Sequence, residues 1–355
     1  MVHPTTEDIA KKLGISRGTV SRVLNNHGRV SEDTCRKVLE AVDQLNYSPN
    51  KAARALAMNR SFKIAVIFFS EPIYYWNHLQ LGVNRAYDEL KHFGLEVRCF
   101  ITDIKRPEEQ VSLMEQLANE DFDAIAVAPN DPLIMDEVID KLSDKGLPIL
   151  VFNSDVPSSK RFCYIGCNYV KGGRLAGELM GKMLNGSGKV AILTISNNII
   201  SIQQRIIGFR EAIAEFPHIE MSGPYRLNRT GEDAYGLTRE LVRQNDGLDG
   251  IFVSFGILDD VARALLDENK QGRIKVVGYD ISESISEYLR QNIIHSVITH
   301  EPFTQGYISV KILYRLLYEG TRPAQTIINT RLEAVFKENL EYFTGEQEHY
   351  EILFK

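Results

Sequence analysis

The sequence lacks the features of a secreted, disulfide-bonded or membrane-spanning protein. No apolar run approaches the roughly 20 residues that cross a bilayer, and Met1 to Glu7 lacks the basic start and apolar core of a secretory signal. The four cysteines form no CxxC pair, and Cys163 and Cys167 have no neighbours that would complete a zinc set. We therefore expect a cytoplasmic protein with free thiols, without a metal site, a cofactor or a membrane partner.

The common signatures of catalysis and nucleotide binding are also missing. No GxGxxG follows the first predicted strand, and GxxxxGK[ST], GxSxG and HExxH do not occur. The "GSGK" at Gly186 to Lys189 precedes a strand instead of opening a helix, which is typical of a plain turn. These absences argue against an enzyme.

Charge is distributed unevenly along the 355 residues, a length that predicts two or three domains. The whole chain carries 41 basic and 47 acidic residues, a net charge of -6. Its first 60 residues hold ten basic and six acidic residues, so this segment alone is at +4. A basic segment on an acidic chain points to a local site for nucleic acid.

The basic segment has the pattern of three short helices. Thr5 or Thr6 caps a helix that ends at Gly14, Ser16 caps a second one, and Ser31 caps a third. The short connection at Gly14 is typical of a helix-turn-helix. Val20 and Val23 are predicted to face inward. Exposed residues of the second helix would then meet DNA, with arginines on base edges and hydroxyls on phosphates: Arg17, Gly18, Thr19, Ser21 and Arg22.

A second signal follows in "NYSPNKAARALAMNRS", Asn46 to Ser61. Pro49 breaks the preceding helix and Asn50 caps a short alanine-rich stretch, which is too short to hold a helix alone in water. We expect it to fold on DNA, with two copies in the minor groove and Leu56 inserted between base pairs.

These residues resemble the DNA-binding headpiece and hinge of the LacI/GalR family of bacterial transcriptional regulators. The resemblance rests on "TEDIAKKLGISRGTVSRVLN", "VSEDTCRKVLEAVDQLNYSPN" and "AARALA". It implies a homodimer on a pseudo-palindromic operator, with Arg17, Gly18 and Arg22 at base-contacting positions. The full set of expected DNA contacts is Thr6, Ser16, Arg17, Gly18, Thr19, Ser21, Arg22, Asn25, Tyr47, Asn50, Ala53 and Leu56.

From Phe62 onward, short apolar runs alternate with amphipathic helical stretches. The runs are "KIAVIFF", "LEVRCFI", "DAIAVAP", "LPILVFN", "KVAILTI", "DGIFVSF", "IKVVGYD" and "IHSVITH". Such runs predict two parallel sheets covered on both faces, with a ligand in the cleft at the carboxyl ends of the strands. The predicted fold class is α/β: a small all-α headpiece followed by a two-lobed domain.

Aromatic and polar residues follow several of these runs. Ser70, Tyr75 and Trp76 come after the first, Asn153 and Asp155 after the fourth, and Asp280 and His300 end later ones. Aromatic faces stack on the C–H face of a sugar while polar groups bond its hydroxyls. A single aromatic residue at such a place is as often part of the core or of a lid.

The segment from about Phe62 to Phe343 is similar to periplasmic sugar-binding proteins and to the effector domains of the same regulators. The resemblance places Tyr75 and Trp76 on an aromatic clamp, Asn153 and Asp280 on ligand hydroxyls, and Arg205 at a polar helix start. His300 stands where glutamine is frequent. Ala128 and Ser154 depart from the simple-sugar pattern, which leaves room for a larger or less polar ligand.

The expected organisation is a headpiece (1–48), a hinge (49–61), a two-lobed domain (62–343) and a tail (344–355). Lobe 1 should comprise about 62–165 and 297–325, and lobe 2 about 166–296 and 326–343. The predicted function is a ligand-gated regulator, most simply a repressor, with operator DNA, a sugar-like effector and a second copy of itself as partners. Two alternatives stay open: lobes that only dimerise, and an enzyme using Asp155, Asp280 and His300 as acid and base.

Overall fold

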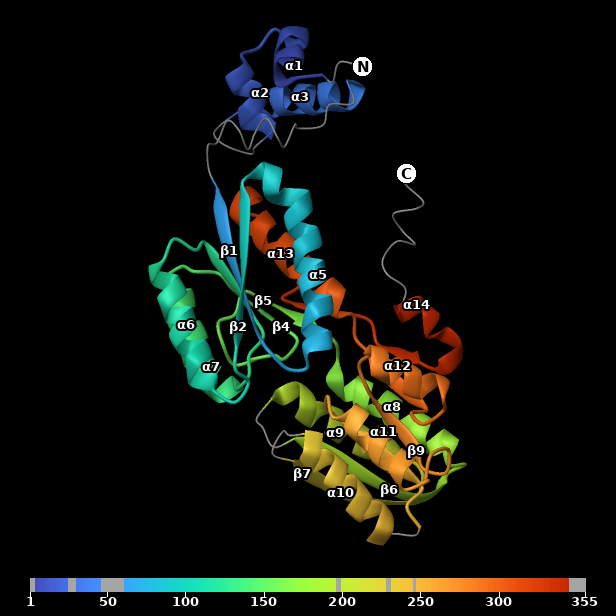
Figure 1. Cartoon of the computed structure of the whole chain (residues 1–355). Helices are drawn as coiled ribbons and strands as arrows, with labels where there is room; N and C mark the ends of the chain where they lie inside the picture. Colours follow the sequence, from blue (N-terminus) through green and yellow to red (C-terminus); the bar gives the residue numbers. More distant parts are fainter. Residues whose placement is uncertain are drawn as a thin grey trace. The chain divides into compact units, whose positions relative to one another are not determined.

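The computed structural model describes residues 4–24, 30–45, 61–195, 199–227, 231–244 and 247–344. It divides into two compact units whose boundary along the chain lies between Ser61 and Phe62. Each unit is described by itself (Figure 1).

The described residues of the N-terminal unit form three short helices, α1 (Thr6–Leu13), α2 (Arg17–Leu24) and α3 (Glu32–Gln44). The hydroxyl of Thr5 accepts a hydrogen bond from the Asp8 amide, and the Asp8 carboxylate accepts one from the Thr5 amide, which forms a capping box. Gly14 ends α1 in the left-handed region, at φ 64°, where glycine has no steric cost. Ser31 caps α3.

A small apolar core joins these helices. Its fully buried members are Ile9, Val20 and Val38, and the partly buried Val23 packs against them. Val20 and Val23 therefore face inward, as predicted. The opposite side of α2 is left to solvent.

The larger unit contains two six-stranded sheets. The first has the order β11-β5-β4-β3-β1-β2, with strands β1 (Phe62–Phe69), β2 (Leu95–Thr102), β3 (Ala124–Val127), β4 (Ile149–Phe152), β5 (Cys163–Gly166) and β11 (Ile327–Asn329). The second has the order β12-β10-β9-β8-β6-β7, with β6 (Ser187–Ile195), β7 (His218–Leu227), β8 (Gly250–Val253), β9 (Lys275–Tyr279), β10 (Ser296–Thr299) and β12 (Glu333–Val335). All pairings are parallel except that of β12 with β10.

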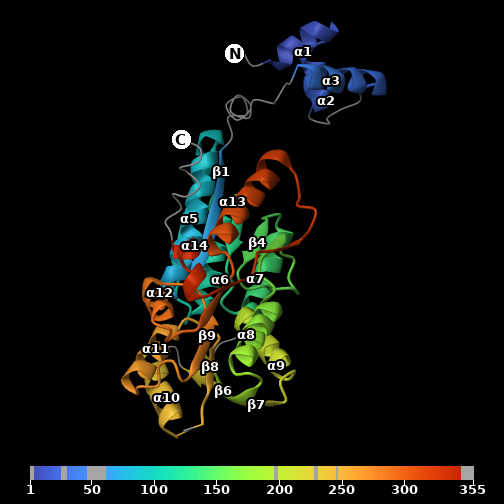
Figure 2. The same cartoon turned by 90° about the vertical axis from the view of Figure 1, so that its right-hand side faces the viewer.

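Helices cover both faces of each sheet, as predicted from the buried apolar strands. In the first lobe, defined by the first sheet, α5 and α13 lie on one face and α6 and α7 on the other (Figure 1). In the second lobe, α8 and α9 lie opposite α10, α11 and α12 (Figure 2). Their bounds are α5 (Ile73–Leu90), α6 (Pro107–Asn119), α7 (Pro132–Asp144), α8 (Tyr169–Met183), α9 (Ile200–Ile213), α10 (Gly231–Gln244), α11 (Leu258–Asp267), α12 (Glu283–Arg290) and α13 (Pro302–Glu319). Short turns of helix span η1 (Lys91–Phe93), η2 (Lys337–Asn339) and α14 (Glu341–Thr344).

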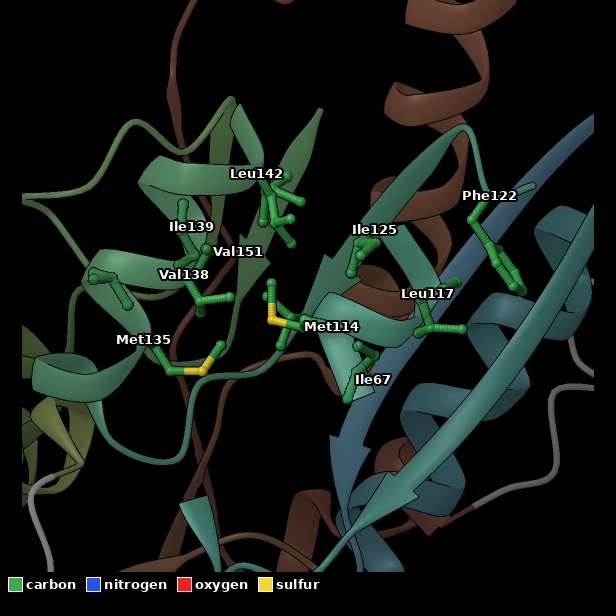
Figure 3. Packing of buried hydrophobic residues seen from close by; sticks show 14 of the residues in the cluster. Ile67, Met114, Leu117, Phe122, Ile125, Met135, Val138, Ile139, Leu142 and Val151 are labelled. Carbon is green, nitrogen blue, oxygen red and sulfur yellow. The ribbon is translucent and has the colours of Figure 1, made fainter. Parts of the chain in front are cut away.

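Each lobe has its own apolar core. Figure 3 shows the one between the first sheet and helices α6 and α7, where Met114, Ile125 and Ile139 are fully buried. Phe209 and Phe252 stack in the second core with ring centroids 4.1 Å apart. Separate cores allow the lobes to behave as two bodies.

Glycines bring paired helices into backbone contact in both lobes. A Cβ at Gly173 of α8 would overlap the carbonyl oxygen of Arg205 on α9, and one at Gly208 would overlap that of Val170. Gly82 and Gly306 have the same relation between α5 and α13. The contact at Gly173 fixes the backbone of Arg205, a predicted site residue.

The chain passes between the lobes three times: after β5, between β10 and α13, and between β11 and β12. The expected boundaries at about 297 and about 326 precede the observed passages by a few residues, because β10 completes the second sheet and β11 pairs with β5 in the first. Within the part of the chain that the structure describes, no helix is both long enough and apolar enough to cross a membrane.

Candidate functional site

The exposed side of α2 carries the predicted base-contacting residues. Arg17, Gly18, Ser21 and Arg22 are exposed, and among the described residues neither arginine has an ion-pair or side-chain hydrogen-bond partner. A helix face with two free guanidinium groups can enter a major groove, where arginine donates two hydrogen bonds to guanine.

Two of the predicted hydroxyl contacts have a local structural role as well. The Thr19 amide donates to Ser16 Oγ at 3.0 Å, which caps α2, and the two hydroxyl oxygens lie 2.9 Å apart. Thr6 is half-buried on α1. Asn25, Tyr47, Asn50, Ala53 and Leu56, with the expected hinge helix, lie outside the described residues, as does the tail beyond Thr344.

A pocket lies where the strands of both sheets end, and we call it the inner pocket. Its cavity volume in this structure is about 20 Å³. Its lining residues are Phe69, Pro72, Tyr75, Trp76, Asn153, Ile199, Ser201, Ile202, Arg205, Phe255, Asp280 and His300. Six of the eight residues predicted for an effector site are thus brought together.

The aromatic wall of the inner pocket is held rigidly. Trp76 stacks on Phe68 with centroids 5.5 Å apart and meets Phe69 and Tyr75 edge-on at 4.5 and 4.7 Å. The indole N–H donates to the carbonyl oxygen of Glu71 at 3.0 Å. A preformed aromatic surface of this kind can take a flat ligand face with little loss of side-chain entropy.

A chain of hydrogen bonds runs along the polar wall. The Asn153 amide donates to the Tyr75 hydroxyl at 2.7 Å, and that hydroxyl donates to Gln305 Oε1 at 3.2 Å. The Gln305 amide then donates to the carbonyl oxygen of His300 at 2.8 Å. This series of hydrogen bonds connects the residues that follow β4 and β10 with residues of α5 and α13.

Arg205, Asp280 and His300 form a buried charged cluster. Arg205 Nη2 lies 2.9 Å from His300 Nε2, which lies 3.2 Å from Asp280 Oδ1. Arg205 also donates to the carbonyl oxygen of Ser254 at 3.0 Å and lies 3.8 Å from the centroid of the Tyr279 ring. Its Nε has no partner among the described residues, so a donor remains for a ligand oxygen.

Burial and charge set the protonation of this cluster. Burial lowers the pKa of His300, so the imidazole is neutral at neutral pH. Burial also acts to raise the pKa of Asp280, but the electrostatic interaction and hydrogen bond with His300, together with the charge of Arg205, outweigh it and keep that pKa below its usual value. The cluster therefore pairs one guanidinium with one carboxylate and has no net charge.

Backbone strain marks two pocket residues. Asn153 and Asp280 directly follow β4 and β9 and have φ of 63° and 69°. This left-handed region is costly for most residues, and asparagine and aspartate tolerate it best. Strained residues at the ends of two strands aim their side chains into the cleft.

Ser70 and Asp155 are the two predicted residues that do not line the inner pocket. Ser70 is exposed, and its amide donates to the carbonyl oxygen of Thr102 at 3.2 Å. Asp155 is bound at both oxygens by Arg161, with Nη2 2.9 Å from Oδ2. The turn after Asn153 points Asp155 away from the pocket, which also separates it from Asp280 and His300 as an acid–base set.

The sequence did not single out several lining residues. Ile199, Ser201 and Ile202 come from the start of α9, and Phe255 follows β8. Phe255 could have been found, because it ends the run "DGIFVSF" as Asp280 ends "IKVVGYD". The start of α9 carries a weaker signal, because it follows the predicted run "KVAILTI" only after a short connection and does not end the run itself.

The cysteines of this chain form no disulfide and no metal site among the described residues. The four cysteines are free, Cys163 and Cys167 are buried, and burial raises the pKa of these two thiols to about 11 and about 12. Within the described ranges, no three metal-binding side chains come together. These thiols pack in the core of the unit and do not act as nucleophiles at neutral pH.

Both units match known protein families. Residues 5–50 match the bacterial regulatory proteins of the lacI family, and residues 64–321 match the periplasmic binding protein domain. The HTH-type transcriptional regulator CelR of Thermobifida fusca is 27% identical over 350 residues, 93% of this chain and 97% of CelR. The chain belongs to the LacI family of regulators. It is a DNA-binding transcriptional regulator with a periplasmic-binding-protein-like domain.

Other relatives support this assignment. The sucrose operon repressor of Streptococcus mutans is 27% identical, covering 79% of this chain and 83% of that protein. The solute-binding protein of Burkholderia graminis, solved with D-arabinose, has a TM-score of 0.75 at 25% identity and matches 81% of this chain and 99% of its own. The LacI-family fold predicted from the sequence is confirmed.

Proposed function

We propose that this LacI-family regulator is a homodimeric repressor of a pseudo-palindromic operator and that a sugar or sugar-like molecule in the inner pocket controls its DNA binding. The observation that carries the proposal is the composition of the pocket. The aromatic rings of Tyr75 and Trp76 line the same space as the polar side chains of Asn153, Arg205 and Asp280. Ring stacking opposite hydroxyl-bonding groups is the chemistry that holds a polyhydroxylated ring.

The pocket also supports control by lobe closure. Trp76 and Asn153 belong to the first lobe, while Arg205 and Asp280 belong to the second. A ligand bound between them stabilises the arrangement in which both walls contact it. Affinity for DNA then changes because that arrangement differs from the ligand-free one.

The two exposed arginines of α2 support the operator part of the proposal. One headpiece presents only this short face, so two copies on an inverted repeat are needed for tight and specific binding. A regulator of chromosomal DNA acts in the cytoplasm. No catalytic step is proposed for the pocket.

The test uses the full-length chain. Sites are selected from a random duplex library, and affinity for the best site is measured by fluorescence anisotropy with and without a panel of neutral sugars. We expect an inverted repeat and at least one sugar that changes the affinity. A selected site without internal symmetry, or an affinity that no sugar changes, would contradict the proposal.

Two arginine variants on α9 localise the effect. Arg205→Met removes the buried guanidinium of the inner pocket, and Arg210→Met removes an exposed one on the same helix. We expect the first to bind the operator without responding to the sugar, and the second to respond as the wild type does. Thermal unfolding of both variants shows whether the fold is retained.

A further inference from the structure

A second cavity adjoins the inner pocket, and we call it the outer compartment. Its cavity volume is about 180 Å³, and it shares two wall residues, Pro72 and Phe255, with the inner pocket. Its remaining walls are Ile104, Ile195, Ile257, Gly256, Glu71 and Asp260. The two spaces therefore lie next to each other.

The strand order shows where this compartment lies. Its residues follow β1 and β2 in the first sheet and end or follow β6 and β8 in the second. The three passages between the lobes involve β5, β10, β11 and β12, on the other side of both sheets. The outer compartment is therefore on the side of the cleft away from these passages, and its walls come from both lobes.

Its chemistry differs from that of the inner pocket. Ile104, Ile195 and Ile257 are buried and apolar, and Phe255 adds an aromatic face. The polar groups are the carboxylates of Glu71 and Asp260, and Arg263 binds one oxygen of Asp260 at 3.1 Å. Among the residues that the structure describes, no lysine, arginine or histidine lines this compartment.

A buried hydroxyl stands beside the compartment without a partner. Tyr74 OH has no hydrogen-bond partner among the described residues. A Cβ placed on the wall residue Gly256 would lie 3.2 Å from this oxygen. The glycine leaves the hydroxyl close to the space that a ligand would fill, where it can donate to a ligand oxygen.

We infer that the effector is a two-ring glycoside with an uncharged second unit, one ring in the inner pocket and the other in the outer compartment. This inference rests on the proposed function and narrows its ligand class. Apolar walls take the C–H face of the second ring, and the two carboxylates accept bonds from its hydroxyls. A uronic acid or sugar phosphate is disfavoured there because its anion would face Glu71 without a cation.

The test compares one-ring and two-ring ligands by calorimetry on the full-length chain. The probes are glucose, galactose, cellobiose, maltose and lactose. We expect one disaccharide to bind at least about tenfold more tightly than either monosaccharide. Equal or weaker binding of every disaccharide overturns the inference but leaves the proposed function intact if a monosaccharide binds. If none of the neutral sugars binds, both are overturned.

Two variants assign the difference to the outer compartment. Ile104→Trp fills the compartment and should remove the advantage of the disaccharide while leaving monosaccharide affinity within about twofold. Glu71→Gln changes an exposed side chain and should weaken the disaccharide alone, whereas the matched control Glu120→Gln, at the far end of α6, should change neither. An unchanged disaccharide affinity in both compartment variants contradicts the inference, and the second variant remains informative if the first fails to fold.

Discussion

The Nε2 atom of His300 lies 3.2 Å from Oδ1 of Asp280, with the imidazole fully buried and the carboxylate nearly so. Asp280 is the carboxylate that balances the buried Arg205, because His300 is neutral. This contact connects the end of β9 with the end of β10, next to a point where the chain passes between the lobes.

Replacing Asp280 should therefore leave a buried guanidinium uncompensated. We expect Asp280→Asn to lower the free energy of unfolding by about 3 to 5 kcal/mol, and to abolish sugar binding. Asparagine keeps the left-handed backbone, so the effect reports on charge. Urea unfolding provides the measurement, with Asp259→Asn on α11 as a half-buried control. A loss below about 1 kcal/mol would show that Arg205 is balanced in another way.

The helix contact at Gly208 predicts a second stability effect. Gly208→Ala forces a methyl group into the backbone of α8 and should lower the free energy of unfolding by about 1 to 3 kcal/mol. Gly236→Ala on α10 has open space around it and should stabilise the protein by about 0.4 to 1 kcal/mol. Opposite signs in denaturant melts support the contact, and a neutral Gly208→Ala would refute it.

His295 should make the protein less stable in mild acid. Burial, aided by the charge of Lys275, lowers the pKa of His295 to about 4, against about 6.5 in an unfolded chain. The unfolded state therefore binds the proton first, and stability that is present above pH 6.5 is lost as the pH falls toward 4. The Val276 amide donates to His295 Nδ1 at 3.2 Å, which also requires the unprotonated ring.

Thermal melts between pH 7.5 and 4.5 check this effect. His295→Gln should flatten the pH dependence of the melting temperature, while the exposed control His218→Gln on β7 should leave it as in the wild type. The same slope in all three proteins would mean that His295 is not the group responsible.

Arg22→Ala should weaken binding to the selected operator by about 1 to 3 kcal/mol and random DNA by less. The control is Arg36→Ala on α3, where the guanidinium is paired with Asp33 at 2.8 Å. It removes the same charge without touching the exposed face of α2. Fluorescence anisotropy at fixed salt gives both affinities. Equal losses on operator and random DNA would assign Arg22 to phosphate contacts only.

The pattern of the sequence predicted most of the fold because eight strands are short runs rich in apolar residues. Three of the four strands it did not predict carry weaker signals. β11 and β12 are only three residues long, and β7 has mostly exposed side chains and a Gly–Pro pair at Gly223. Their pairing is decided by neighbouring strands and not by their own composition. β5 is as short and as buried as β3 and β4, so its length does not explain why it was missed.

The site was predictable to the extent that it follows strand ends. Asn153, Asp280 and His300 come directly after strands and converge, whereas Asp155 shares the same loop but turns to Arg161. Loop direction is set by local hydrogen bonds that a residue pattern does not reveal. The contribution of Ile199 and Ile202 depends on how α9 packs on α8 through Gly173 and Gly208, which is a tertiary property.

The late position of β11 and β12 in the chain has a consequence for synthesis on the ribosome. Both sheets receive an outer strand from residues 327–335, so neither lobe is finished until that stretch has emerged. The three-helix unit at the other end emerges first and completes its core from local residues alone. A prematurely terminated chain would carry a folded DNA-contacting part on two lobes with open strand edges, a form that proteases and aggregation remove.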